Sequence, residues 1–153
     1  MIGQLIAAII GTVAFCALFS VPRKYYLFCG ITGGLGWMVY LLASRVFGYG
    51  VSILFAAAVV AFTARIMTVC LSCPSPVFLI PGLFPLVPGA GVYWTTYYTV
   101  IGDLQMAGQA GYDALKCAVA IVLAIVFIYE LPQAMFTKPL LAFKGIIRSR
   151  KES

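Results

Sequence analysis

The sequence predicts an all-α integral membrane protein with about five transmembrane helices, one of them broken by prolines and glycines over residues 74–101. Two observations lead to this fold class. Of the 153 residues 63% are hydrophobic and 9% are charged, whereas soluble domains carry about 25% charged residues. Charge-free stretches also recur along the chain, and about 20 apolar residues in a helix cross a bilayer. We therefore expect a single membrane domain over residues 1–153.

The first part of the chain predicts three uninterrupted helices. The expected spans cover residues 2–21, 26–44 and 46–65. The first stretch lacks the basic start of a signal peptide, so we interpret it as a transmembrane helix. Glycines recur along the second, and we interpret them as packing residues because small side chains let helix backbones approach closely in lipid. The third span is expected to end at Arg65.

The longest charge-free stretch, residues 66–102, is interrupted too often to form one regular helix. It contains Pro74, Pro76, Pro81, Pro85 and Pro88. Each proline removes a backbone donor and clashes with the preceding turn, so we expect a broken span over 76–101 with a short helix from about residue 90. Broken backbone must be buried in protein or line a wet cavity. We expect the carbonyls released by Pro81, Pro85 and Pro88 to be available to water or a polar solute.

The remaining chain predicts a polar loop over 103–113, a last span over 114–136 and a basic tail over 137–153. Placing most basic residues on the cytoplasmic side gives a multi-pass protein of the cell (inner) membrane with a cytoplasmic C-terminus. If residues 74–89 re-enter and leave on one side instead, the parity of the crossings changes.

Composition argues against several classes of function. The chain has no histidine, so it cannot form a Ser-His or Cys-His catalytic pair. We therefore do not expect an enzyme. Cys70-x-x-Cys73 has no second CxxC pair, and we expect neither a metal nor a cofactor. The net charge of +6 is concentrated at the ends of apolar stretches, which indicates membrane orientation and no nucleic-acid partner.

The broken segment is the candidate site, because broken helices build substrate sites in secondary transporters. The start of the helix near Gly89 offers a positive dipole end that suits a carboxylate. Hydroxyls of Tyr93, Thr96 and Tyr97 could add contacts. A kinked packing helix with interfacial tyrosines is the alternative interpretation.

The pattern Pro-Gly-x-x-Pro-Leu-Val-Pro-Gly-x-x-x-Tyr at 81–93 resembles the signature of the threonine/serine exporter superfamily. Ala64-Arg65 and the Phe-x-Val-Pro-Arg-Lys stretch at 19–24 are also similar, and the resemblance covers roughly residues 15–135. It is to the short-subunit type, equivalent to the C-terminal half of the long exporters. Carried over by motif, the expected site residues are Pro81, Gly82, Pro85, Pro88, Gly89 and Tyr93, with Arg65 flanking them.

The resemblance implies export of small carboxylate metabolites, either threonine and serine or a dicarboxylate such as succinate. It also implies a larger membrane partner subunit, equivalent to the N-terminal half of the exporters. Arg65 is either an interfacial anchor or a substrate or gate contact. Glu130, the one carboxylate within an expected span, could relay protons or pair with Lys138.

The sequence therefore predicts a membrane subunit of a two-component, proton-coupled secondary transporter. Two alternatives stay open: a non-transporting assembly subunit of a membrane complex, and a homo-oligomeric channel.

Overall fold

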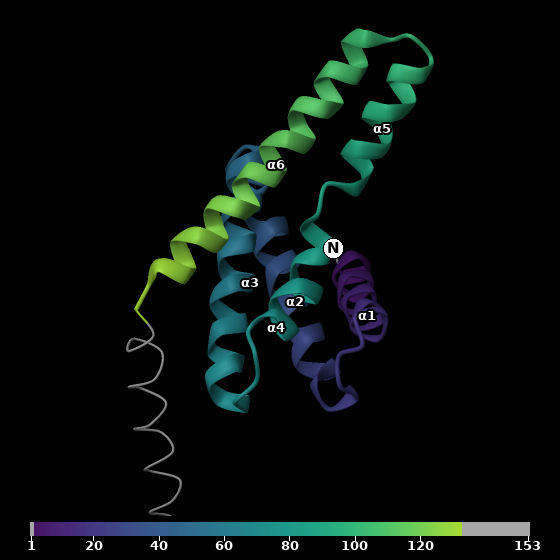
Figure 1. Cartoon of the computed structure of the whole chain (residues 1–153). Coiled ribbons are helices and arrows are strands. Elements are labelled where there is room, and N and C mark those ends of the chain that lie inside the picture. The colour runs from purple at the N-terminus through teal and green to yellow at the C-terminus, as the bar shows by residue number, and fades with distance from the viewer. Residues whose placement is uncertain (1, 133–153) are drawn as a thin grey trace, which may run out of the picture.

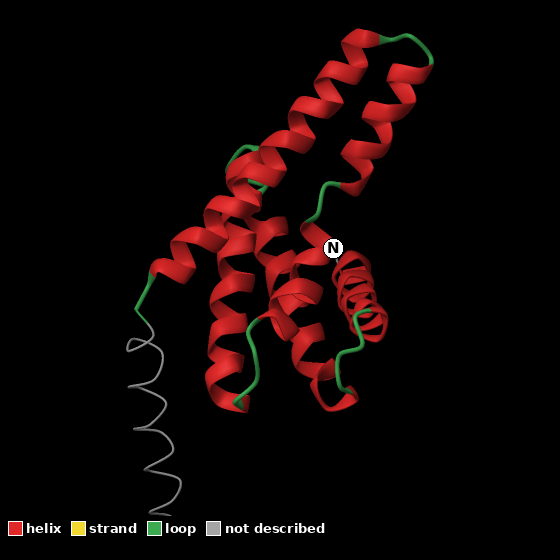
Figure 2. Ribbon diagram, viewed as in Figure 1, coloured by secondary structure: helices red, strands yellow, loops and turns green. Residues whose placement is uncertain are grey.

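The described part of the chain, residues 2–132 of a computed structural model, folds into helices joined by short loops, with no strand in that range (Figure 2). The helices are α1 (Ile2–Leu18), α2 (Tyr26–Ala43), α3 (Tyr49–Leu71), α4 (Pro76–Leu83), α5 (Gly89–Val100) and α6 (Leu104–Glu130), with the 3-10 turns η1 (Arg23–Tyr25) and η2 (Phe84–Leu86). The all-α prediction is confirmed. The expected basic tail, 137–153, lies outside the described residues.

Three of the described helices are long and apolar enough to cross a membrane: α2 extended by η1, α3 and α6. The pair formed by α4–η2 and α5, bent by 48°, passes the same test jointly and brings the number to as many as four. Helix α1 is apolar but shorter, at 17 residues. These lengths support a multi-pass membrane protein, and the five crossings with their expected bounds stay a prediction.

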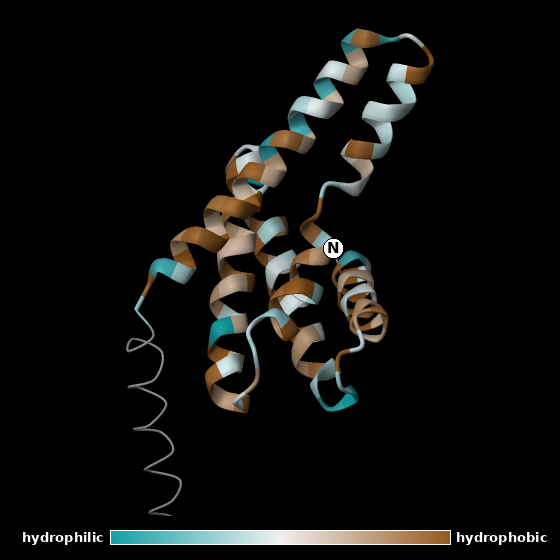
Figure 3. Ribbon diagram, viewed as in Figure 1, coloured by the Kyte–Doolittle hydropathy of each residue, from teal (hydrophilic) through white to brown (hydrophobic). Residues whose placement is uncertain are grey.

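Helices α1 to α4 form a bundle, and the C-terminal half of α6 runs along α3 (Figure 1). Helix α5 and the first half of α6 form a hairpin that extends beyond this bundle (Figure 1). Hydrophobic residues cover much of the bundle, whereas hydrophilic ones gather in the loop between α1 and α2 and along the first half of α6 (Figure 3). The break between η2 and α5 therefore lies where the hairpin joins the bundle.

Several expected boundaries differ from the structure, among them the end of the last span, expected at residue 136, where the helix α6 already ends at Glu130. The loop predicted over 103–113 is helical from Leu104, because the Asp103 carboxylate accepts a hydrogen bond of 3.0 Å from the Met106 N–H and caps α6. The third helix does not end at Arg65 but continues to Leu71. The short helix expected from about residue 90 is confirmed as α5, which begins at Gly89.

Glycines let α2, α3 and α4 pack closely. A methyl group on Gly33 of α2 would overlap the side chain of Thr12 in α1. A methyl group on Gly82 of α4 would lie 3.0 Å from Thr32 Cγ2 and 3.1 Å from Val60 Cγ1. The packing role expected for the α2 glycines is confirmed, and the same role extends to Gly82.

We expect Gly33→Ala to lower the free energy of unfolding by about 1–3 kcal/mol, the usual cost of overpacking a tight interface. Thermal denaturation of the purified chain in detergent measures this. Gly11→Ala is the matched control, because no atom lies within 4 Å of the methyl it would add. Equal melting temperatures for the two variants would contradict the close packing of α1 on α2.

Candidate functional site

The break in the chain is built by a proline turn. Helix α4 passes into η2, Val87 is extended, and Pro88 caps α5 with φ −78° and ψ 49°. The Gly89 N–H donates to the Val87 carbonyl at 2.8 Å. Pro88 is thus the central residue of a turn close to the inverse γ-turn, which redirects the chain within three residues.

The carbonyls released by the prolines are not free, contrary to the expectation from sequence. Pro81 has no N–H for the Val77 carbonyl, and the Cys29 thiol donates to it instead at 3.4 Å. The Pro81 carbonyl accepts from the Phe84 N–H. The Phe84 carbonyl, which Pro88 leaves without a helical donor, accepts from the Val87 N–H at 3.2 Å.

Two N–H groups at the start of α5 have no hydrogen-bond partner in the backbone of the turn. The Val92 N–H donates to the Pro88 carbonyl at 3.0 Å, and the Gly89 N–H is used in the turn. Within residues 2–132, no backbone hydrogen bond outside the helices involves the N–H of Ala90 or Gly91, and these positions have no partner inside α5. The start of α5 therefore presents two donors and the positive end of its dipole.

A cavity of about 120 Å³ lies beside these donors. It is lined by Trp37 and Tyr40 of α2, Tyr49 and Ile53 of α3, and Pro85, Leu86, Val87, Pro88, Ala90 and Gly91 of the break. The Trp37 Nε1 is buried and has no hydrogen-bond partner in the described part of the chain. No charged side chain is among these lining residues. The lining residues thus include the start of α5 with its backbone N–H groups, and no carboxylate is among them, which suits a small anion.

The predicted site residues of the proline motif lie in two places. Pro85 and Pro88 line the cavity, and Gly89 lies between two lining residues. Pro81 and Gly82 are buried and do not line it, and Gly82 packs against Thr32 and Val60. Their part in substrate binding stays a prediction.

Tyr93, Thr96 and Tyr97 do not line the cavity. Tyr93 and Tyr97 are 61% and 45% exposed, and their rings stack with centroids 6.4 Å apart. The Thr96 hydroxyl donates to the Val92 carbonyl of its own helix at 3.0 Å. These side chains lie on an exposed face of α5, where a role in substrate binding stays a prediction.

A family model described as "Threonine/Serine exporter, ThrE" matches residues 4–130. The chain belongs to the threonine/serine exporter family. This is a family of membrane transporters and not of enzymes. No curated protein and no solved structure matches the chain significantly.

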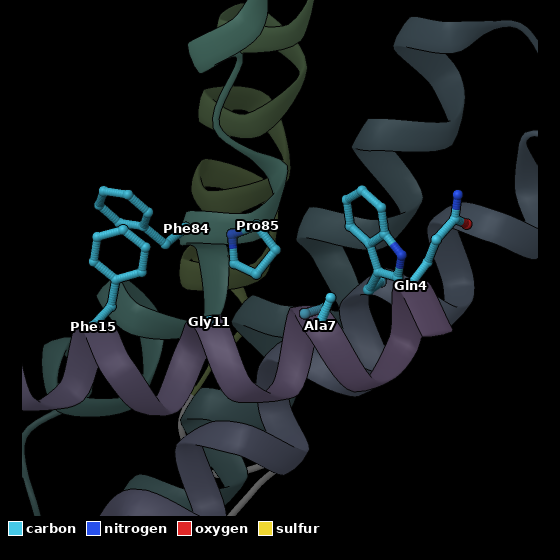
Figure 4. Close-up of a pocket in the computed structure, with 8 residues that line it drawn as sticks. Gln4, Ala7, Gly11, Phe15, Phe84 and Pro85 are labelled. Atoms are coloured by element: carbon cyan, nitrogen blue, oxygen red, sulfur yellow. The ribbon is translucent and has the colours of Figure 1, made fainter. Parts of the chain in front are cut away.

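A second groove of this exporter-family chain opens between α1 and the break. It has a volume of about 300 Å³. Figure 4 shows Ala7 and Gly11 along α1 and the Phe15 and Phe84 rings side by side. Pro85 follows Phe84 on the broken segment that faces α1. The Phe15 and Phe84 ring centroids are 3.4 Å apart. Pro85 and Trp37 line both hollows, so they form the wall between the groove and the donor-lined cavity.

Arg65 lies far from the cavity. It follows Ile53, a lining residue, on α3, and at about 1.5 Å per residue the two positions are about 18 Å apart along the helix. The side chain is 7% exposed. Its Nη1 donates to the carbonyls of Ile128 and, at 2.8 Å, Leu131. A cation favours the carbonyl-bearing end of a helix, so Arg65 fastens the end of α6 to α3.

Glu130 is the last residue of α6 and is exposed. It therefore lies at the same end of α6 as the Arg65 contacts and not beside the cavity. Lys138, its possible partner, lies outside the described residues. Proton coupling through Glu130 stays a prediction.

Trp37, Tyr40 and Tyr49 are not among the site residues that the sequence predicts. The spacing of Trp37 and Tyr40 carries a signal, because residues three apart share one face of a helix. In the sequence, the glycines of α2 indicate helix packing and do not mark this aromatic pair as a site. The two rings lie 5.1 Å apart. Tyr49 joins the site only because α3 packs on α2.

We expect Arg65→Met to lower the melting temperature, because the carbonyls of Ile128 and Leu131 lose a charged donor while an unbranched apolar side chain is kept. The loss of charged hydrogen bonds is worth about 1.5–3 kcal/mol. The control is Arg23→Met at an exposed arginine of η1. An Arg65→Met chain as stable as wild type would show that the end of α6 does not depend on this contact.

Proposed function

We propose that this chain is one membrane subunit of a two-component secondary transporter that exports a small carboxylate metabolite, coupled to the proton gradient. The donor-lined cavity beside the break is the observation that carries the proposal. Alternating access would take place around this cavity, as in transporters whose sites are formed by broken helices. Membership of the threonine/serine exporter family gives the transporter class.

The donors of the cavity favour a carboxylate as the recognised group. The Ala90 and Gly91 N–H groups converge at a helix start, where anions bind well, and the indole N–H of Trp37 can only donate. Threonine and serine fit this chemistry, and so does a dicarboxylate such as succinate. The substrate is therefore proposed as a small carboxylate, with these three compounds as the first to test.

The exposed face of α5 supports a partner subunit. No residue of this helix is buried in the single chain, and its large side chains Val92, Tyr93, Trp94 and Tyr97 are each at least 45% exposed. Aromatic residues are enriched at protein interfaces. We propose that a larger membrane subunit, equivalent to the N-terminal half of the long exporters, covers this face in the inner membrane, with the C-terminus of this chain in the cytoplasm.

Transport into proteoliposomes tests the function. Vesicles with this chain alone, the partner alone and both together are loaded with radiolabelled serine, threonine or succinate, with and without a pH gradient. Flux that needs both chains and the gradient supports the proposal. Equal flux from the partner alone identifies an assembly subunit, and passive flux from this chain alone identifies a channel.

We expect Trp37→Phe to reduce the export rate about tenfold or more, because the lost N–H would bind the charged carboxylate and such a bond is worth about 1.5–3 kcal/mol. The phenyl ring keeps most of the aromatic wall. Tyr112→Phe is the control, since it removes a ring donor on α6 outside both the cavity lining and the exposed face of α5. Export by Trp37→Phe at the wild-type rate would show that the cavity is not part of the transport pathway.

We expect the double substitution Tyr93→Ala/Tyr97→Ala to weaken co-purification with the partner while the chain still inserts and keeps its melting temperature. Both rings are exposed on α5, so their loss leaves no cavity in the single chain. Phe55→Ala, an exposed ring on α3, is the control. Unchanged recovery of the complex would place the partner on another face.

A further inference from the structure

Two buried cysteines of different helices hold the proline-containing segment by its backbone. The Cys29 thiol of α2 donates to the Val77 carbonyl in α4 at 3.4 Å. The Cys117 thiol of α6 donates to the Leu86 carbonyl in η2 at 3.3 Å. Both cysteine side chains are fully buried. The Cys29 thiol therefore satisfies a carbonyl of α4, and the Cys117 thiol satisfies a carbonyl of η2, the last turn before the break.

Each of these carbonyls lacks the donor that a regular helix would supply. The residue four positions after Val77 is Pro81, which has no N–H. The residue four positions after Leu86 is Ala90, which already belongs to α5, and no backbone bond joins the two within residues 2–132. In the interior of a membrane protein such carbonyls need a donor from a neighbouring helix, a side chain or an ordered water. The thiols supply what the chain itself has lost.

The Leu86 carbonyl is the one that matters for the cavity. Leu86 is 4% exposed, is a lining residue, and lies between Pro85 and Val87, which also line the cavity. Cys117 reaches it from α6, the helix that pairs with α5 in the hairpin. The same thiol thus connects the last turn before the break to the helix that carries the segment after it.

We propose that Cys117 is a positioning residue of the cavity, whose thiol fixes Leu86 and so holds the break in the geometry that faces Trp37 and Tyr40. Its importance for transport rests on the proposed function, whereas its effect on the break does not. A thiol is a weak donor, but a buried carbonyl without any donor is more costly than a weak hydrogen bond. Removing the S–H therefore loosens the break.

A reporter thiol at the break tests this in the purified full chain without substrate or partner. Leu86→Cys places the reporter in the last turn before the break, at a side chain that is 4% exposed and is therefore labelled only when the turn opens. It is introduced with Cys70→Ala and Cys73→Ala, because those two native thiols are only partly buried. The rate of labelling by a water-soluble maleimide then reports the opening of the turn, and the melting temperature reports the whole fold.

Cys117→Val keeps an apolar side chain and removes the donor, and we expect it to raise the labelling rate about tenfold. Cys117→Ser keeps a donor and is expected to label like the parent. Thr12→Val is the matched control, because it removes a fully buried donor of α1 whose hydrogen bond goes to the Ala8 carbonyl of its own helix.

Three results would overturn the proposal: labelling of Cys117→Val at the parent rate, labelling of Cys117→Ser as fast as Cys117→Val, or an equal rise for Thr12→Val. The first two would make Cys117 a packing residue only. If Cys117→Val does not fold, as its melting curve would reveal, Cys117→Ala replaces it with the same expectations. Since no step measures export, a chain that proves not to transport carboxylates leaves this result intact.

Discussion

The structure depends on one constraint: every backbone polar group in the interior of a membrane protein needs a partner. The prolines at 81, 85 and 88 break the helical pattern of partners, and the surrounding chain restores most of it. Two thiols, a 3-10 turn and the turn at Pro88 satisfy the carbonyls of the segment. The N–H groups of Ala90 and Gly91 are what this repair leaves over, and the cavity lies beside them.

The need for a partner also distinguishes the end of α6, whose polar groups are satisfied within the chain, from the start of α5, whose polar groups are not all satisfied within the described residues. The carbonyls at the end of α6 are occupied by the buried guanidinium of Arg65, so that terminus has its counter-charge built into the fold. The start of α5 faces a cavity without a charged side chain. A terminus with its partner supplied holds helices together, whereas one without it can receive a ligand.

Packing decides where the open terminus faces. Glycines in α2 and α4 bring these helices close to α1 and α3, which places Trp37 and Tyr40 opposite the break. The hairpin of α5 and α6 then extends from this point with its aromatic face uncovered (Figure 1). For a member of the threonine/serine exporter family, the single chain thus combines a built cavity with a surface that suits a second subunit.

The sequence by itself determined the membrane class, the helical fold, the break and the family motif, because hydropathy, proline spacing and glycine content act locally along the chain. It also named Pro85 and Pro88 as candidate site residues, and the structure shows that both line the cavity. Only the tertiary structure decided that the released carbonyls are occupied, that Arg65 contacts the end of α6, and that Trp37, Tyr40 and Tyr49 complete the site. These facts join residues on different helices, and no local pattern records which donor reaches which carbonyl across a helix interface.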